Sequence, residues 1–132
     1  MNQKEKGRVF VFDDDADSLQ SVVAALRRDG FDVFPFADPR EGLARVEAEG
    51  GDVVITDLRM PGLTGLEVLR HVTKKIPEVP VVILTAYGTV EGAIEAVRAG
   101  ASDFLLKPVE IPRLRAAVFK ALKERGMHRE IE

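Results

Sequence analysis

The strongest constraint on the fold of this chain is an alternation of short apolar runs with longer segments of helical period, repeated five times from Arg8 onward. The apolar runs are Val9–Phe12, Phe31–Phe34, Val53–Thr56, Val81–Leu84 and Asp103–Leu106. Short apolar runs bounded by turn residues are typical of buried strands, and their alternation with helices indicates βαβ units. The sequence therefore predicts an α/β fold built on a parallel five-stranded sheet.

The helical segments between these runs carry start and stop signals. Asp29-Gly30 ends the first helix, Asp38-Pro39 opens the second, and Thr64 with Glu67 three residues later forms a capping box for the third. The fourth helix begins at Thr89, and the last runs roughly from Ile111 to Arg125. Their apolar stripes contain Leu19, Val22, Val23 and Leu26; Leu43 and Val46; Leu66, Leu69, Val72 and Ile76; Val90, Ala93, Ile94 and Val97; and Leu114, Val118 and Leu122.

Two features indicate where strands lie in the sheet. Pro35 directly follows the second strand, and because proline cannot donate a hydrogen bond, we expect that strand at an edge. The fourth strand, Val81–Leu84, is continuously hydrophobic, which favours a central position.

Composition excludes several classes of protein. The 132 residues fit one domain, here residues 1–125, with 126–132 as a tail or the start of a linker to an effector domain. A net charge of -3 without a basic run argues against direct nucleic-acid binding. No apolar run approaches the roughly 18 residues of a membrane span. The absence of cysteine and of a secretory signal favours a cytoplasmic protein.

Chemically distinctive side chains follow four of the five predicted strands. Asp13-Asp14-Asp15 follow the first, Asp57 the third, Thr85 the fourth and Lys107-Pro108 the fifth. An acidic cluster alone is usually a solvated loop or a helix cap. Because right-handed crossovers bring these strand ends to one edge of the sheet, where α/β proteins bind ligands, their joint placement predicts a site.

The residue types in this cluster suggest its chemistry. Ionised Asp14 and Asp57 about 4 Å apart would repel by roughly 4 kcal/mol at an effective dielectric near 20, so a cation is needed between them. Oxygen ligands favour Mg²⁺. A carboxylate beside Mg²⁺ and a lysine can act as a nucleophile towards a phosphoryl group, with Thr85 donating its hydroxyl. The two histidines, His71 and His128, are interpreted as surface residues.

Four ordered motifs resemble the receiver domain of two-component response regulators. They are Val11-Phe12-Asp13-Asp14-Asp15, the segment Val54 to Gly62, Val82-Ile83-Leu84-Thr85-Ala86 and Phe104-Leu105-Leu106-Lys107-Pro108. The resemblance covers about Arg8 to Lys123 and implies a flavodoxin-like, doubly wound sheet of strand order 2-1-3-4-5 with helices on both faces.

The resemblance also implies roles for individual residues. Asp57 would accept a phosphoryl group from the phosphohistidine of a histidine kinase, and Mg²⁺ would be held by Asp13, Asp14, Asp57 and the Arg59 carbonyl. Thr85 would be the switch hydroxyl, and Lys107 would pair with the phosphoryl group, followed by a cis peptide at Pro108. Such a domain is a switch that catalyses only its own phosphorylation and dephosphorylation.

Other positions keep two interpretations. Phe104 occupies the family's aromatic switch position, but a core role explains it equally well. Arg59 and Tyr87 would influence the phosphoryl lifetime, and Tyr87 is otherwise an ordinary surface residue.

The segments from Thr85 to Glu91 and from Ala99 to Phe104 are similar to receivers of enhancer-binding transcription activators. By that analogy the helix from Thr89, the fifth strand and the last helix form the output face, and possible partners are an effector domain and a second copy. The chain lacks a Walker-type loop.

Two rival functions differ in testable ways. A haloacid-dehalogenase-type phosphatase would use Asp13 as nucleophile and Asp15 as acid and base, but the chain lacks the threonine usually found after that pair and has no room for a substrate cap. A degenerate receiver would bind partners constitutively. The presence of Asp14, Asp57, Thr85 and Lys107 argues against it.

Overall fold

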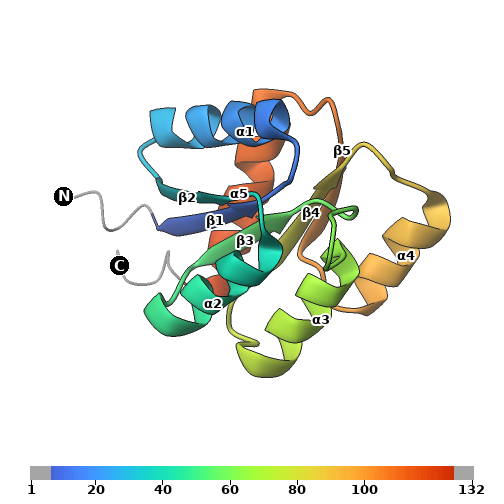
Figure 1. Cartoon of the computed structure of the whole chain (residues 1–132). Coiled ribbons are helices and arrows are strands. Elements are labelled where there is room, and N and C mark those ends of the chain that lie inside the picture. The colour runs from blue at the N-terminus through green and yellow to red at the C-terminus, as the bar shows by residue number, and fades with distance from the viewer. Residues whose placement is uncertain (1–6, 127–132) are drawn as a thin grey trace.

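A computed structural model describes residues 7–126 of the chain, which form a sheet covered on both faces by helices (Figure 1). Within these residues five parallel strands pair in the order β2-β1-β3-β4-β5, which confirms the predicted order and fold class. The strands are β1 (Arg8–Phe12), β2 (Asp32–Phe36), β3 (Val53–Thr56), β4 (Val81–Thr85) and β5 (Asp103–Leu106). All the strand carboxyl ends therefore lie at one edge of the sheet.

The helices divide into two layers, each with its own core. Side chains of α1 (Ala16–Arg28) and α5 (Ile111–Arg125) pack with one face of the sheet. The other face packs against α2 (Pro39–Glu49), α3 (Gly65–Lys75) and α4 (Val90–Arg98). Every residue of β3 and β4 is buried, as expected for inner strands of a parallel sheet covered on both faces.

Local sequence signals place the helix starts as predicted. Asp38 caps α2 with Pro39 as its first residue, and the Asp38 carboxylate accepts the Arg40 N–H at 2.9 Å. Thr64 and Glu67 form the reciprocal capping box of α3. Each cap satisfies backbone N–H groups that the helix itself leaves unpaired, which is why these boundaries are legible in the sequence.

Strand β2 lies at an edge, as predicted, but the prediction that it ends before Pro35 is wrong. The strand continues to Phe36, and Pro35 pairs with Val11. Asp32 and Phe36 hydrogen-bond to the β1 side, whereas the Val33 carbonyl accepts from Arg27 at the outer edge. Alternate residues thus face β1, and Pro35 faces outward, where its missing N–H breaks no ladder bond.

Helix α4 is amphipathic, but its apolar face is exposed. Val90, Ile94 and Val97 are exposed over 74%, 47% and 63% of their surface. Among the nine residues of α4, all of which the structure describes, Ala96 alone is buried. The apolar stripe predicted from the sequence therefore exists, and residues 7–126 leave it exposed.

Two predictions concern residues beyond the structure's description. His128 and the tail Met127–Glu132 lie outside the described residues. Within residues 7–126, no helix has the length and apolar character required to cross a membrane.

Candidate functional site

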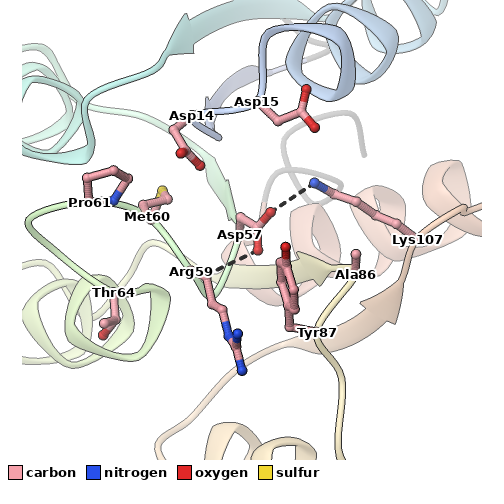
Figure 2. Close-up of a pocket in the computed structure, with 10 residues that line it drawn as sticks. All are labelled: Asp14, Asp15, Asp57, Arg59, Met60, Pro61, Thr64, Ala86, Tyr87 and Lys107. Carbon is pink, nitrogen blue, oxygen red and sulfur yellow. Dashed lines mark hydrogen bonds and ion pairs between the residues drawn. The ribbon is translucent and has the colours of Figure 1, made fainter.

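The ends of β1, β3, β4 and β5 surround a cleft of about 650 Å³ at the carboxyl edge of the sheet (Figure 2). Asp14, Asp57, Ala86 and Lys107 are among the residues that line it, and each comes from a different strand end. The predicted convergence of these strand ends is therefore present. The Thr85 side chain is fully buried, and Thr85 is the last residue of β4, which ends one residue later than the predicted Leu84.

Lys107 joins two of the predicted acidic residues. Its Nζ atom lies 2.9 Å from Asp57 Oδ2 and 2.5 Å from Asp13 Oδ2, and all three side chains are largely buried. The second oxygen of Asp13 accepts the Asp15 N–H at 3.0 Å. The Lys107–Pro108 peptide bond is cis. One ammonium group thus bridges two carboxylates and offsets part of their mutual repulsion, so the three side chains together carry a net charge of -1.

These contacts determine the charge state of the site. Burial raises the pKa of the Asp57 carboxyl, but hydrogen bonds from Thr85 and Lys107, the Lys107 charge and the Arg59 N–H outweigh it. The pKa of Asp57 is therefore lowered from its ordinary value of 3.8. Burial lowers the pKa of Lys107, but hydrogen bonds to Asp13 and Asp57 and their charges raise it above 10.5. At neutral pH Asp57 is an anion, as a nucleophile must be, and Lys107 is a cation.

The backbone around Asp57 is tightly packed. The Arg59 N–H donates to Asp57 Oδ1 at 3.3 Å, and the Gly65 N–H donates to the Leu58 carbonyl at 2.8 Å. A Cβ atom on Gly65 would lie 2.2 Å from the Asp57 carbonyl oxygen, so only glycine allows the start of α3 to approach this closely. The nucleophile candidate is therefore held by both its side chain and its main chain.

Thr85 and Phe104 lie on the neighbouring strands β4 and β5. The Thr85 hydroxyl accepts the Tyr87 N–H at 3.1 Å, and Thr85 is among the neighbours that lower the pKa of Asp57. Phe104 is half-buried and packs against the core shared by α2, α3 and α4. The ring is thus part of the core edge and also adjoins the loop that follows Thr85, which leaves both interpretations of Phe104 open.

The donor set suits a hard divalent cation. Among residues 7–126, no three His, Cys, Asp or Glu side chains form a ready metal cluster. Asp13 and Asp57 nevertheless present buried carboxylates, and Asp14 extends into the same cleft (Figure 2). Oxygen-only donors of this kind fit Mg²⁺, which binds through one or two carboxylates together with water and phosphate oxygens.

One interaction at the mouth of the cleft was not foreseen from the sequence. The Arg59 guanidinium carbon lies 4.4 Å from the centre of the Tyr87 ring, within the range of a cation–π interaction (Figure 2). Each residue stands two positions beyond a key group, Asp57 or Thr85. Their spacing in the sequence places both near the site, but their mutual contact requires the fold.

Other candidate residues have structural partners. The Asp15 side chain caps α1 by accepting the Asp17 and Ser18 N–H groups, which is a different task from the acid and base role of the phosphatase alternative. His71 on α3 is partly exposed and pairs with Glu47 on α2, outside the residues that line the cleft. Its surface interpretation agrees with this position.

Comparison with known proteins identifies relatives along almost the whole chain. A family model of the response regulator receiver domain matches residues 9–119. The C4-dicarboxylate transport transcriptional regulatory protein DctD of Rhizobium meliloti is 35% identical over 90% of this chain, and this chain spans 26% of the length of that protein.

Comparison with solved structures identifies the same family. A response regulator receiver domain protein from Clostridium thermocellum superposes with a TM-score of 0.84 at 35% identity, covering 91% of this chain and 97% of that one. The beryllofluoride-activated NtrC4 receiver domain, described as a dimer, gives a TM-score of 0.85 at 27% identity, covering 89% and 98%. With its sheet order, its strand-end carboxylates and these relatives, the chain belongs to the response regulator receiver domains of two-component systems, among those related to transcription activators.

Proposed function

We propose that Asp57 is the phosphoacceptor of this receiver domain and takes a phosphoryl group from the phosphohistidine of a histidine kinase. The observation that carries this assignment is the Asp57 carboxylate at the cleft, 2.9 Å from the Lys107 ammonium group, with its pKa lowered so that it is ionised at neutral pH. In the transfer an Asp57 oxygen bonds to phosphorus while the phosphorus–nitrogen bond breaks, and its electron pair returns to the imidazole. The domain is a signalling module, and its chemistry is limited to its own phosphorylation and dephosphorylation.

Each neighbouring side chain has a separate role in the proposed phosphoryl transfer. Lys107 neutralises charge on the phosphoryl oxygens, and the Thr85 hydroxyl donates to one of them. Asp13, Asp14, Asp57 and the Arg59 carbonyl would hold Mg²⁺, on which receiver domains generally depend. When bound, the ion supplies charge neutralisation at the phosphoryl oxygens. A hydrogen bond to a charged group contributes about 1.5–3 kcal/mol, so Thr85 alone cannot supply the roughly 5.5 kcal/mol of a complete two-state switch.

The proposed output is a change in the surface formed by α4, β5 and α5. Val90, Ile94 and Val97 on α4 and Leu106 on β5 are exposed there. Thr85 precedes α4 by a short loop, and Phe104 lies in β5, so both switch candidates adjoin this surface. We propose that it contacts an effector domain or output protein in transcription regulation, or a second copy of the chain. The dimer described for the activated NtrC4 receiver supports the latter.

The proposed setting is the cytoplasm, since the sequence contains no cysteine. With a net charge of -3, the domain itself would not bind nucleic acid. The assigned domain boundary, residues 1–125 with a linker from 126, belongs to the same proposal. Because the chain spans about a quarter of DctD, the remainder of such a protein would provide the effector.

Intact mass after incubation with acetyl phosphate and Mg²⁺ tests the assignment. The wild-type chain should gain the mass of one phosphoryl group, and Asp57→Asn should gain none. Asp15→Asn is the matched control, because Asp15 caps α1 and should leave phosphorylation intact. A phospho-species that persists in Asp57→Asn would contradict the proposal. Loss of acetyl phosphate turnover in Asp15→Asn, with no stable adduct in the wild type, would favour the phosphatase alternative.

Saturable Mg²⁺ binding separates a working receiver from a degenerate one. Titration should shift the backbone amides of residues 13–14 and 57–59, and removal of the ion with EDTA should prevent adduct formation. Amides that do not respond to Mg²⁺ would favour the degenerate alternative.

A further inference from the structure

A contact between Leu106 and Gly88 joins β5 to the loop between β4 and α4. Leu106 immediately precedes Lys107, and 56% of its surface is exposed. A Cβ atom on Gly88 would lie 2.0 Å from Leu106 Cδ2 and 3.3 Å from a ring carbon of Phe104. The φ angle of Gly88 lies outside the positive region, so this glycine serves to make space rather than to allow an unusual backbone. The leucine side chain rests directly on the loop backbone.

The same loop carries Tyr87, whose position is fixed from two sides. Its N–H donates to the Thr85 hydroxyl at 3.1 Å, and its ring stacks on Arg59 with 4.4 Å between the guanidinium carbon and the ring centre. Lys107 also donates its backbone N–H to the Thr85 carbonyl at 2.9 Å, which joins the ends of β4 and β5. Leu106 therefore packs on the residue next to Tyr87, at the point where the loop leaves the sheet.

We propose that Leu106 is a positioning residue: by resting on Gly88 it holds Tyr87 against Arg59 at the mouth of the cleft and thereby limits the access of water to phosphorylated Asp57. The inference rests on the proposed function. In hydrolysis a water oxygen bonds to phosphorus while the bond from the Asp57 oxygen to phosphorus breaks. The electron pair stays on the carboxylate, a proton leaves the water, and inorganic phosphate is released. If the Tyr87 ring is held less firmly at the mouth of the cleft, hydrolysis of the aspartyl phosphate becomes faster.

Tyrosine fluorescence tests the first part of the inference without phosphorylation. Tyr87 is the only tyrosine and the chain has no tryptophan, so the signal reports on this loop alone. In Leu106→Ala, acrylamide quenching of Tyr87 should rise towards the value of the urea-unfolded chain. Phe119→Ala is the control, because Phe119 is a half-exposed large side chain on α5 that packs on Phe31. It should leave the quenching unchanged.

The hydrolysis rate of the acetyl phosphate adduct tests the second part. Leu106→Ala removes the packing and should raise the hydrolysis rate. Gly88→Ala introduces a methyl group into the packing and should also change the rate. Each change should be about threefold or more, as expected for coupled groups in contact. The double variant places the new methyl group in the space that the leucine leaves. It should therefore hydrolyse more nearly like the wild type than either single variant does. Additive effects would mean that the two positions do not act through their mutual contact.

The outcomes separate the two proposals. If Leu106→Ala leaves quenching and hydrolysis unchanged, or changes hydrolysis without quenching, Leu106 does not position Tyr87 and the inference is wrong. Additive single and double variants also overturn it. If the wild-type chain forms no adduct, the proposed function fails instead, and the quenching comparison still decides whether Leu106 holds Tyr87 in place.

Discussion

Helices α4 and α5 lie on opposite faces of the sheet next to β5, and they are attached to it very differently (Figure 1). Helix α5 buries Leu114, Ala117, Val118, Ala121 and Leu122. Helix α4, which the structure describes completely, buries Ala96 alone. Burying an aliphatic side chain stabilises a protein by about 1.5–3 kcal/mol. A helix anchored at one alanine can shift at far smaller cost than one anchored at five positions.

The contrast extends to polar contacts. Arg115 on α5 makes a bidentate ion pair with Asp29 at the end of α1, with distances of 2.9 and 3.0 Å. Helix α4 is tied to α3 by an exposed ion pair between Arg70 and Glu95 at 3.0 Å. The fold thus places a firmly packed helix and a lightly held one on opposite faces of the sheet beside β5, the strand that Lys107 follows. This arrangement suits the change that we propose for the surface of α4, β5 and α5 when Asp57 is phosphorylated.

The largest expected effect is on global stability. Leu114→Ala should lower the free energy of unfolding by about 2–5 kcal/mol, because it opens a cavity under α5. Ile94→Ala on α4 should change it by no more than about 0.5 kcal/mol, since the side chain is half-exposed and α4 leaves it outside the core. Urea unfolding of both variants measures the difference. Equal losses would show that α4 is anchored as firmly as α5.

A smaller loss of stability is expected from a larger side chain at Ala96, the buried residue that attaches α4 to the sheet. Ala96→Leu should cost about 1–3 kcal/mol, and its amide shifts should be concentrated in residues 89–101, because the helix can move away from the sheet. Ala93→Leu, on the same helix but only half-buried, is the control. Amide shifts spread through α3 and β4 would mean that the core, rather than the helix, yields.

The smallest effect concerns the tie between α3 and α4. Arg70→Ala should cost about 0.2–1 kcal/mol, the range of exposed ion pairs, and should speed amide hydrogen exchange in α4 up to about fivefold. A double-mutant cycle with Glu95→Ala isolates the pair, and Lys74→Ala on α3 is the control for loss of a surface cation. A coupling energy of zero would leave Ala96 as the main attachment of α4.

The fold could be predicted because its signals are local. The caps at Asp38 and Thr64 and the apolar runs of the strands act within a few residues, and the strand order followed from the family resemblance. The error at Pro35 arose because a missing N–H matters only if it faces a neighbouring strand, and that depends on register. Likewise, the period of Val90, Ile94 and Val97 indicates a helix but not whether its own chain covers the apolar face.

The candidate site was legible for a similar reason. Asp13, Asp14, Asp57, Thr85 and Lys107 stand at strand ends, and the topology of a parallel sheet brings such ends together. The side-chain contacts at the site could not be predicted from the sequence. That Lys107 reaches both Asp13 and Asp57, that Arg59 meets Tyr87, and that Leu106 lies on Gly88 depend on side-chain directions across segments distant in sequence.

The close approach of Gly65 to the Asp57 carbonyl has a mechanical consequence. Because the main chain of Asp57 packs closely against the first turn of α3, it has little space to move towards that helix if Asp57 is phosphorylated as proposed. We expect the displacement to be directed sideways instead, towards the loop after Thr85 and the lightly held α4. The close packing at Gly65 would then determine the direction of the structural change that follows phosphorylation.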